Sequence, residues 1–514
     1  MAVDSQVVFT VDGREVAVAD DGASLLEVLR DRLGLKGSKD GCSPQGQCGC
    51  CTVLIDGSPR VACVTPVKRV AGRTVTTIDG LANAERWAEA FCATGASQCG
   101  FCTPGIIVRL DALRAAGAGA DDVDKVERAL LAHLCRCTGW RTILDAWSSF
   151  GGNEPAPRDL DAASARAALE GGGPQRVGPD VALGLGGFAD DAAPDGSLVA
   201  VPDGAGGWAV GETLTEARRA AEKTQGRRTS VELGHPIDVP AGEWAVTLQT
   251  TWVEPAYLET DASWCEPGGV PASPLANGGA FGGKVGSGAM SAARELADRH
   301  GRAVRVLLSR EDTVRLGAKR PPIAAGIRRD GTGVVCVART QHLRDQITRF
   351  APGLHVAEVD VPGPRTSIAL RAAGWAEAAV LLAGARGEAV PITAPNGAVA
   401  EASVDSGGVH VRVSAGDPLD EVVLRSYCIG AAHMALGWVT SEGIAVDASG
   451  EPLDLTIRSF GVLRAVDTPP ITVEVENDGS APRNGSDAVF TAVAAATWVA
   501  QGCPPTFPTG RGLR

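Results

Sequence analysis

The stretch GCSPQGQCGCCTVLIDGSPRVAC, residues 41–63, decides the fold of the N-terminal part of this chain. Three of its cysteines lie on one tight loop and a fourth follows on an adjoining β-type run, which is how a plant-type [2Fe–2S] cluster is held. The loop glycines let the backbone bend around inorganic sulfide and aim N–H groups at it. The spacing between the first two ligands is one residue longer than in the plant-type motif, which affects the path of the loop. The predicted ligands are Cys42, Cys48, Cys51 and Cys63, and Cys50 between them is expected to point away.

A second group of cysteines follows in QCGFCTPG, residues 98–105, and LCRCTGW, residues 134–140. A CxxC pair directly before a helix start places two sulfurs near helical N–H groups, which favours thiolate, and a later CxC supplies the other pair. Four cysteines also suit a tetrahedral zinc ion, but the ferredoxin-type loop upstream favours a second [2Fe–2S] cluster. The predicted ligands are Cys99, Cys102, Cys135 and Cys137, whereas Cys92 and His133 are expected to be packed residues.

Composition supports metal ligation in a cytoplasmic protein. Ten of the fourteen cysteines fall between Cys42 and Cys137, and a reducing compartment favours metal binding over disulfides for such a cluster. The formal net charge of −13 argues against nucleic acid or an anionic membrane surface as the main partner. The N-terminus lacks a signal-peptide pattern, and the apolar run at 488–500 is too short to span a bilayer.

The order of local signals predicts an α+β multidomain chain. Two pairs of β-type runs, each split by Asp-Gly, surround a capped amphipathic helix and the first cysteine loop, which is the order of a β-grasp module. Helical patterns follow, and then a stretch rich in Gly, Pro and Ala. We expect a β-grasp [2Fe–2S] ferredoxin-like domain at 1–78, a four-helix [2Fe–2S] domain at 79–152 and a linker at 153–180.

With these motifs in order, the first 150 residues resemble the iron–sulfur domain or subunit of the xanthine oxidase and carbon monoxide dehydrogenase family of molybdenum hydroxylases. The resemblance implies that each of the two domains carries one [2Fe–2S] cluster. It also implies that the cluster of the helical domain lies next to a molybdopterin, with Gln98 and Cys137 touching the pterin.

Beyond the linker the resemblance continues over shorter stretches. GLGGFADD at 184–191 is similar to the first segment of the family's molybdenum subunit, and NGGAFGGK at 277–284 is similar to its pterin-contacting loop. Read from the residues alone, this loop is an anion-binding turn before a helix, and a purely structural turn is the alternative. Its GxxxxGK spacing does not indicate a nucleoside triphosphatase, because Val285 stands where a magnesium-binding hydroxyl is needed. The resemblance makes Gly279, Phe281 and Gly282 pterin contacts and places Arg371 near the metal.

Two departures from the family affect residues 181–325 and 326–514, the two parts of the expected α/β molybdenum-type region. This region is about half as long as the family's molybdenum subunit. The family's C-terminal glutamate, a general base, has no counterpart at 481–484, and neither Asp478 nor Asp487 fits its motif. The family's glutamine near the apical oxygen is also not found. We therefore expect a shortened and partly degenerate molybdenum-type domain, with no catalytic residue assigned.

The function that follows is electron transfer in a molybdenum-dependent oxidoreductase. A small-molecule substrate would be oxidised at a molybdopterin centre in this chain or, preferably, in a partner subunit. Electrons would then leave through the two clusters to an FAD-binding subunit or another acceptor. The alternative is a non-catalytic assembly or scaffold protein with structural or sensory clusters, and a zinc-stabilised binding module is remote. The sequence leaves the substrate open among purines, aldehydes, N-heterocycles and carbon monoxide.

Overall fold

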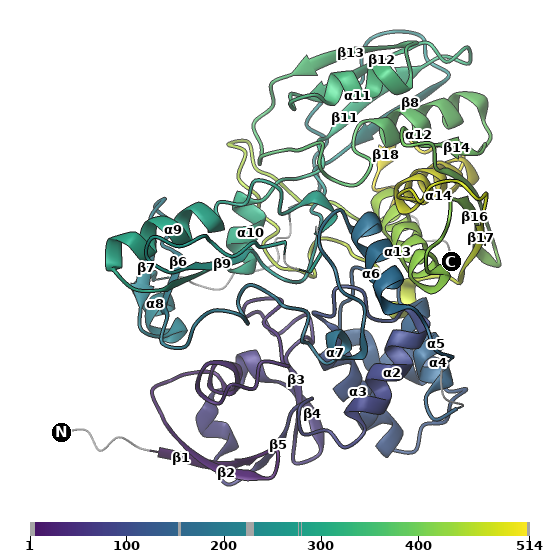
Figure 1. Cartoon of the computed structure of the whole chain (residues 1–514). Coiled ribbons are helices and arrows are strands. Elements are labelled where there is room, and N and C mark those ends of the chain that lie inside the picture. The colour runs from purple at the N-terminus through teal and green to yellow at the C-terminus, as the bar shows by residue number, and fades with distance from the viewer. Residues whose placement is uncertain (1–5, 153–155, 223–230, 276, 279, 511–514) are drawn as a thin grey trace.

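In the part of the chain that it describes, the computed structural model contains four β-sheets and a helical domain (Figure 1). The structure describes residues 6–152, 156–222, 231–275, 277–278 and 280–510. The N-terminal sheet and the helical domain lie together at the bottom of the view, and the three later sheets lie above and beside them.

The N-terminal unit is a five-stranded sheet with the order β2-β1-β5-β3-β4. Neighbouring strands are antiparallel except β1 and β5, which run parallel, so the sheet has the β-grasp arrangement that the sequence predicts. Asp12-Gly13 and Asp56-Gly57 form the two hairpin turns, and all four residues have positive φ. The elements are β1 (Gln6–Val11), β2 (Arg14–Ala19), α1 (Leu25–Glu27), η1 (Val28–Arg32), β3 (Thr52–Ile55), β4 (Ser58–Val61), η2 (Ala62–Val64), η3 (Val67–Val70) and β5 (Thr74–Thr76).

The second unit contains the four predicted helices. Trp87 forms its centre, stacked on Phe150 at 3.7 Å and on Trp147 at 6.1 Å between ring centroids. Pro104 stands in the first turn of α3, where its missing N–H costs no helical hydrogen bond. The elements are α2 (Ala84–Thr94), α3 (Thr103–Ala115), α4 (Val123–Ala129), η4 (Leu130–Ala132) and α5 (Arg141–Ser149).

The predicted linker at 153–180 is wrong as a description of this segment, because it contains helix α6 (Leu160–Gly171) and the start of α7 (Pro179–Ala182). Asp159 caps α6, and Gly172 ends it at a φ of 65°. Its buried Ala163 and Ala167 pack against Val423 and Tyr427 of the C-terminal half. Small side chains, which made the segment look like a linker, are what let this helix approach its neighbour closely.

A four-stranded sheet with the order β7-β6-β10-β9 follows, and α9 packs against it through Ala293, Leu296 and Ala297. Strand β10 runs parallel to β6 and antiparallel to β9. The elements are β6 (Leu198–Pro202), β7 (Trp208–Gly211), α8 (Leu214–Ala220), β9 (Ala262–Cys265), η5 (Ala280–Gly282), α9 (Ala289–His300), β10 (Val304–Leu307) and α10 (Arg310–Leu316).

The next sheet has the order β13-β12-β11-β8-β18 and crosses the boundary predicted at residue 325. Strand β8 from the first predicted part pairs with β11 and also with β18 near the C-terminus, and residue 325 itself lies inside β11. Local patterns do not reveal pairing between strands so far apart, so that boundary is corrected. The elements are β8 (Val246–Thr250), β11 (Ile323–Ile327), β12 (Gly333–Ala338), α11 (Leu343–Phe350), β13 (Leu354–Val359), α12 (Trp375–Arg386) and β18 (Thr506–Phe507).

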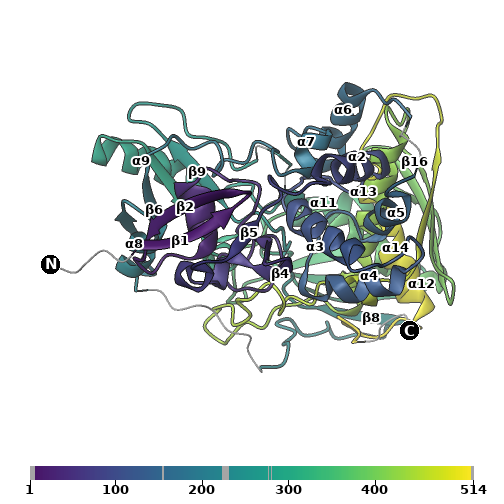
Figure 2. The same ribbon diagram turned by 90° about the horizontal axis from the view of Figure 1, so that it is seen from below.

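The last sheet has the order β14-β15-β16-β17 and packs against the two long apolar helices α13 and α14. Helix α13 is long and apolar enough to cross a membrane, but 89% of its apolar window is buried inside the molecule, as in the core helix of a globular domain. Figure 2 shows α13 beside helix α2 of the helical domain. The elements are β14 (Ile392–Thr393), β15 (Val399–Asp405), β16 (Gly408–Ser414), α13 (Glu421–Thr440), η6 (Ala465–Asp467), β17 (Ile471–Glu476) and α14 (Ser486–Ala500).

Candidate functional site

The first cysteine group gathers on the loop before β3 and at the end of β4. Its four predicted ligands are between 1% and 4% exposed. The thiols of Cys48 and Cys63 hydrogen-bond to that of Cys42 and hold its pKa well below the ordinary value. Backbone N–H groups of Gln45 and Gln47 also donate to Cys42 Sγ, at 3.3 and 3.4 Å. Such N–H···S contacts stabilise sulfur ligands that carry negative charge.

Cys50 does not point away from this group. It is fully buried, and its thiol contacts that of Cys48. A methyl group in place of the Gly41 hydrogen would lie 3.0 Å from Cys50 Sγ and 3.2 Å from Cys48 Sγ, so the glycine is needed for this close approach. The expectation that Cys50 stands apart is therefore corrected.

The thiols of the second group lie in two pairs. Cys99 Sγ and Cys137 Sγ are 3.6 Å apart, and the thiols of Cys102 and Cys135 hydrogen-bond to one another. That bond holds the pKa of Cys135 at about 7. In a [2Fe–2S] cluster each iron takes two thiolates, so two pairs of thiols are compatible with such a cluster, as they are with a tetrahedral zinc ion.

The loops that carry the two groups are in direct contact. The Leu134 N–H, one residue before Cys135, donates to the carbonyl oxygen of Cys48 at 3.0 Å. A methyl group on Gly105 would lie 2.2 Å from the carbonyl oxygen of Gly49, so backbone meets backbone at this point. One hydrogen bond therefore separates the two cluster loops.

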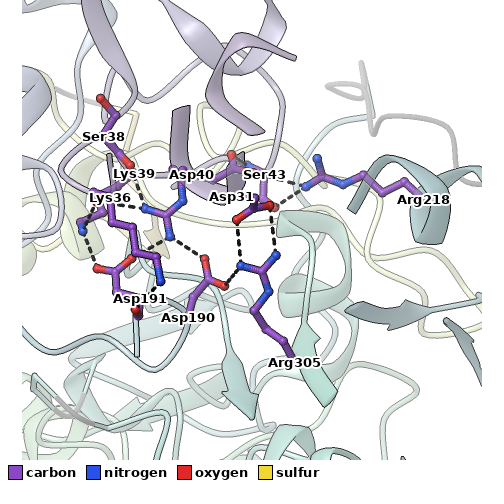
Figure 3. A network of polar contacts seen from close by, with 11 residues as sticks. Asp31, Lys36, Ser38, Lys39, Asp40, Ser43, Asp190, Asp191, Arg218 and Arg305 are labelled. Carbon is purple, nitrogen blue, oxygen red and sulfur yellow. Dashed lines mark hydrogen bonds and ion pairs between the residues drawn. The ribbon is translucent and has the colours of Figure 1, made fainter. Parts of the chain in front are cut away.

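A charged network joins the β-grasp domain to the later part of the chain, close to the first cysteine loop (Figure 3). Arg30, 6% exposed, forms ion pairs with Asp190 and Asp191, each at 2.7 Å. Arg305 of β10 binds Asp31 through both carboxylate oxygens at 2.9 and 3.0 Å. The predicted segment 184–191 therefore supplies the two acids that hold this interface. The other labelled residues are Lys36, Ser38, Lys39, Asp40, Ser43 and Arg218.

A cavity opens beside the second cysteine group, and we name it the pterin cavity after the contacts that the resemblance predicts. Gln98, Cys137 and Phe281, three of the predicted pterin contacts, line it. The Gln98 amide donates to the Cys137 carbonyl oxygen at 3.0 Å and to Ser426 Oγ at 2.9 Å. The remaining lining residues are Cys99, Cys102, Arg136, Gly171, Gln175, Tyr257, Leu258, Glu259, Asn277, Gly278, Ala280, Lys284 and Tyr427.

One other predicted pterin contact is placed differently. Gly282 has a φ of 86° and lies so close to the Ala369 carbonyl oxygen that a methyl group would be 1.8 Å from it, so it joins the glycine-rich loop to the segment before Arg371. Gly279 lies outside the described residues.

The lining of the pterin cavity fits a pterin better than a triphosphate. Gln175 Nε2 is buried without a hydrogen-bond partner among the described residues, while its Oε1 accepts from Tyr427 at 2.5 Å. A buried amide donor of this kind needs an acceptor, which a heteroaromatic ring supplies. Lys284 is 2% exposed and is held by Glu259 at 2.5 Å and the Pro274 carbonyl oxygen at 3.0 Å, so it is not placed to bind phosphate.

A second cavity, which we name the inner cavity, shares Arg136 and Phe281 with the first. Arg136 is held by Glu442 through both carboxylate oxygens, at 2.5 and 2.7 Å. Arg371 lines this inner cavity rather than the pterin cavity. The remaining lining residues are Val253, Glu254, Pro255, Arg320, Leu370, Met434, Trp438 and Phe490.

Two carboxylates stand at the start of α14, where the sequence has no family-type glutamate. Asp487 Oδ1 is 3.6 Å from Arg371 Nε, and burial raises the pKa of Asp487, whereas Arg371 lowers it. Glu170 of α6 is 2% exposed and accepts N–H groups from Gly485 at 3.0 Å and Ser486 at 2.9 Å. The segment predicted as a linker thus supplies an acid to the far end of the chain.

Sequence reasoning missed several residues that line these cavities. Arg136 lies between two predicted ligands, and this position is the one sequence signal that could have identified it as a cavity residue. Gln175 lies in the supposed linker, and Trp438 and Glu442 lie in or next to a helix read only as apolar. Their roles depend on contacts with residues more than a hundred positions away in the sequence. Local sequence patterns give no information about such contacts.

Comparison with known proteins agrees with this arrangement. The 2Fe-2S iron-sulfur cluster binding domain matches residues 9–68, and the [2Fe-2S] binding domain matches residues 77–148. Aldehyde oxidoreductase of Megalodesulfovibrio gigas is 44% identical over 148 residues, 27% of this chain and 16% of that protein. Xanthine dehydrogenase/oxidase of Mus musculus is 38% identical over 160 residues, 28% of this chain and 12% of that protein. The chain thus matches less than a fifth of the length of these relatives in sequence.

Solved structures extend the likeness to the whole fold. The aldehyde oxidoreductase structure from Desulfovibrio gigas superposes with a TM-score of 0.68 at 15% identity, covering 96% of this chain and 97% of that one. The corresponding enzyme from Desulfovibrio desulfuricans gives 0.67 at 14% identity, with the same coverage of both chains. At such identities the likeness is one of fold. Residues 9–68 and 77–148 therefore belong to the two [2Fe–2S]-binding domain families, and the chain as a whole shares its fold with the solved aldehyde oxidoreductase structures.

Proposed function

We propose that this chain is an electron-transferring iron–sulfur component of a molybdenum-dependent hydroxylase or dehydrogenase. The observation that carries the proposal is the position of the second cysteine group. Cys99 and Cys137 line the same cavity as Gln98, Gln175 and the loop around Phe281. Such contact between a cluster ligand and a cofactor cavity is what electron transfer from that cofactor requires.

Each group of side chains has its own part in this proposal. The eight predicted cysteine ligands would hold two [2Fe–2S] clusters, which carry single electrons. Gln98 fixes the Cys137 backbone, and Gln175 offers a buried amide donor to the pterin. When bound, the molybdopterin would supply the two-electron oxidation of a small-molecule substrate. The fit of the pterin cavity favours this chain over a partner subunit as the place where it binds.

The chain provides its own route between the clusters. It runs from Cys137 to Cys135, and then through the Leu134 N–H to the carbonyl oxygen of Cys48. Beyond the first cluster, Val64 is 47% exposed next to the ligand Cys63. We propose this edge of the β-grasp domain as the exit to the acceptor. A flavin on a separate subunit is the acceptor we expect, because the iron–sulfur domains and the aldehyde-oxidoreductase-like region make up the described chain.

Metal and sulfide analysis of the full-length chain, prepared without oxygen, tests the proposal. We expect about four irons and as many acid-labile sulfides per chain, with two EPR signals after reduction. Cys137→Ser should change only the signal of the second cluster, and Cys48→Ser only that of the first. Cys336→Ser, which replaces a cysteine of β12 outside both predicted ligand sets, is the matched control. A colourless zinc protein without labile sulfide would refute the proposal.

A further inference from the structure

Arg310, the first residue of α10, is a buried cation next to the first cysteine loop. Its side chain has no measurable exposure. Nη2 donates to the carbonyl oxygens of Gly41 at 2.7 Å and Leu258 at 2.8 Å, whereas Nε and Nη1 have no hydrogen-bond partner among the described residues. Both hydrogen bonds of this guanidinium thus go to uncharged groups. Burying a cation in this way costs free energy unless a negative charge lies near it.

Gly41 lies between this guanidinium and the predicted cluster ligands. A methyl group on Gly41 would be 3.2 Å from Cys48 Sγ and 3.3 Å from the Leu258 carbonyl oxygen, which is the second acceptor of Arg310. Cys42, the residue after Gly41, is another predicted ligand of the same cluster. A glycine and a peptide carbonyl group therefore lie between the cation and the predicted cluster, and Arg310 itself is out of contact with solvent.

The later part of the chain brings more positive than negative charge to this loop. Among the described residues, the charged side chains beyond residue 180 that hydrogen-bond to residues 40–51 are Arg218, Arg310, Glu311 and Arg458. Arg218 is balanced by Asp40 of the loop, at 3.3 Å. Glu311 can balance only one of the two other arginines, so a positive charge remains.

Arg458 reaches the same loop from the surface. It is exposed, and it donates to the carbonyl oxygen of Gln47 at 2.8 Å. Burial and the charge of Arg464 lower the pKa of Arg458, whereas Cys48 and Cys42 raise it, so its charge and that of the sulfurs act on one another. Because water and dissolved ions screen an exposed charge, we expect Arg458 to affect the cluster less than Arg310 does.

The cation closest in sequence to the second cysteine group is neutralised. Arg136, between the predicted ligands Cys135 and Cys137, is bound by both carboxylate oxygens of Glu442. A carboxylate at this distance cancels most of the field of the cation. Arg310, by contrast, has no carboxylate within hydrogen-bond distance among the described residues.

We infer that Arg310, assisted by Arg458, is a positioning residue that raises the reduction potential of the first [2Fe–2S] cluster. The inference rests on the proposed function, because the charge has this role only where that cluster is present. When one electron passes from the second cluster to the first, the second is oxidised and the first is reduced and gains one negative charge. A permanently protonated guanidinium out of contact with water stabilises this added charge and so favours the arrival of the electron.

Redox titration of the full-length, iron-loaded chain, followed by EPR, tests the inference without turnover. We expect Arg310→Gln to lower the reduced-to-oxidised ratio of the first cluster about tenfold at a fixed poise, which is about 59 mV for a one-electron couple. The second cluster should keep its potential. Arg310→Lys retains the charge and should restore most of the ratio. Arg315→Gln, which removes an exposed cation from the last turn of the same helix, is the matched control.

Salt separates the contributions of the two arginines. The shift in Arg310→Gln should be nearly the same at low and high concentrations of KCl, because the charge is buried. Arg458→Gln should give a smaller shift in the same direction, and this shift should shrink as KCl is added.

Three results would overturn the inference. The first is an unchanged potential of the first cluster in Arg310→Gln with full iron and sulfide content. The second is a loss in Arg310→Lys as large as that in Arg310→Gln, which would make the role of Arg310 structural rather than electrostatic. The third is an unchanged potential in Arg458→Gln at low salt, which also decides the matter if the Arg310 variants do not retain their clusters. A native chain without iron and sulfide would instead refute the proposed function.

Discussion

Buried titratable side chains outside the cysteine groups set the response of this protein to acid. His433 lies in α13 with no measurable exposure, and its Nε2 is 3.1 Å from the Leu463 carbonyl oxygen. Burial, aided by the charges of Arg136 and Arg141, lowers its pKa from the ordinary value of 6.5 to about 3. This histidine is therefore neutral in the folded protein at all but very acidic pH.

We predict that His433 makes the protein lose stability in acid. Below pH 6.5 the unfolded chain binds a proton at this position, whereas the folded chain does not until about pH 3. The stabilisation from this group is thus complete above pH 6.5 and falls by about 1.4 kcal/mol per pH unit below it. Thermal unfolding of the native chain and His433→Gln should show a gap in Tm that narrows as the pH falls. An identical gap at neutral and acidic pH would contradict this.

Local spacing in the sequence predicts the eight cluster cysteines, in two motifs of four. The thiols of the first four contact one another and those of the second four lie in two pairs, and their role as cluster ligands stays a prediction. Local spacing did not predict the roles of Gln175, Glu170 or Trp438. Each of these is defined by a partner on a distant segment, such as Glu170 with the Gly485 N–H, and single-chain patterns hold no information on such pairs.

At the scale of elements, the interface between the β-grasp domain and the segment after α7 depends on charge. Arg30 also donates to the carbonyl oxygens of Lys36 and Ser38, at 3.1 and 2.8 Å, so it fixes the backbone just before the first cysteine loop. Lys39, 1% exposed, lies against Asp191 at 2.5 Å and over the Phe188 ring at 5.1 Å. Two acids and two cations thus share one buried site.

We predict that Arg30→Gln destabilises the chain by about 1.5–3 kcal/mol, because it removes a buried guanidinium that binds the partly buried Asp190 and Asp191. Urea unfolding followed by the visible absorbance of the clusters would measure the change. Arg32→Gln, two residues away, removes a cation that pairs at the surface with Asp21 and should cost less than about 1 kcal/mol. Equal losses in the two variants would show that the network does not hold the interface.

The same elements show where sequence patterns succeed and fail. The hairpins, the helical domain and the long apolar helices follow from turn residues and periodicity. Helix α6 was missed because a Gly- and Ala-rich composition is shared by linkers and by closely packed helices, and only the contacts of Ala163 and Ala167 distinguish them. The domain boundary predicted at residue 325 is wrong because β8 pairs with β18, more than two hundred residues later in the sequence.

At the scale of the whole molecule, the two cluster loops work as one unit because backbone touches backbone between them. Gly105 is the residue that permits this contact, since any side chain there would meet the Gly49 carbonyl oxygen. The fold of the remaining chain matches that of aldehyde oxidoreductase, although its sequence shows the relationship only in short stretches.

We predict that Gly105→Ala pushes the cluster loops apart. Overpacking at this contact should cost about 1–3 kcal/mol, and the magnetic interaction between the reduced clusters should weaken while iron content stays the same. Tm and EPR spectra of the reduced protein would measure both effects. Gly119→Ala is the matched control, because a methyl group there has only Asp122 Oδ2 near it, at 3.8 Å. Unchanged spectra and Tm in Gly105→Ala would contradict the prediction.

The covering of the first cysteine loop by late parts of the chain has a consequence for biosynthesis. Gln45 donates to the Leu455 carbonyl oxygen at 2.9 Å and accepts from the Ile457 N–H at 3.2 Å, and Arg458 donates to the Gln47 carbonyl oxygen at 2.8 Å. These bonds lay a late part of the chain over the loop that carries the thiols. We therefore expect iron and sulfide to be inserted most readily before the last third of the polypeptide has folded onto the N-terminal domains.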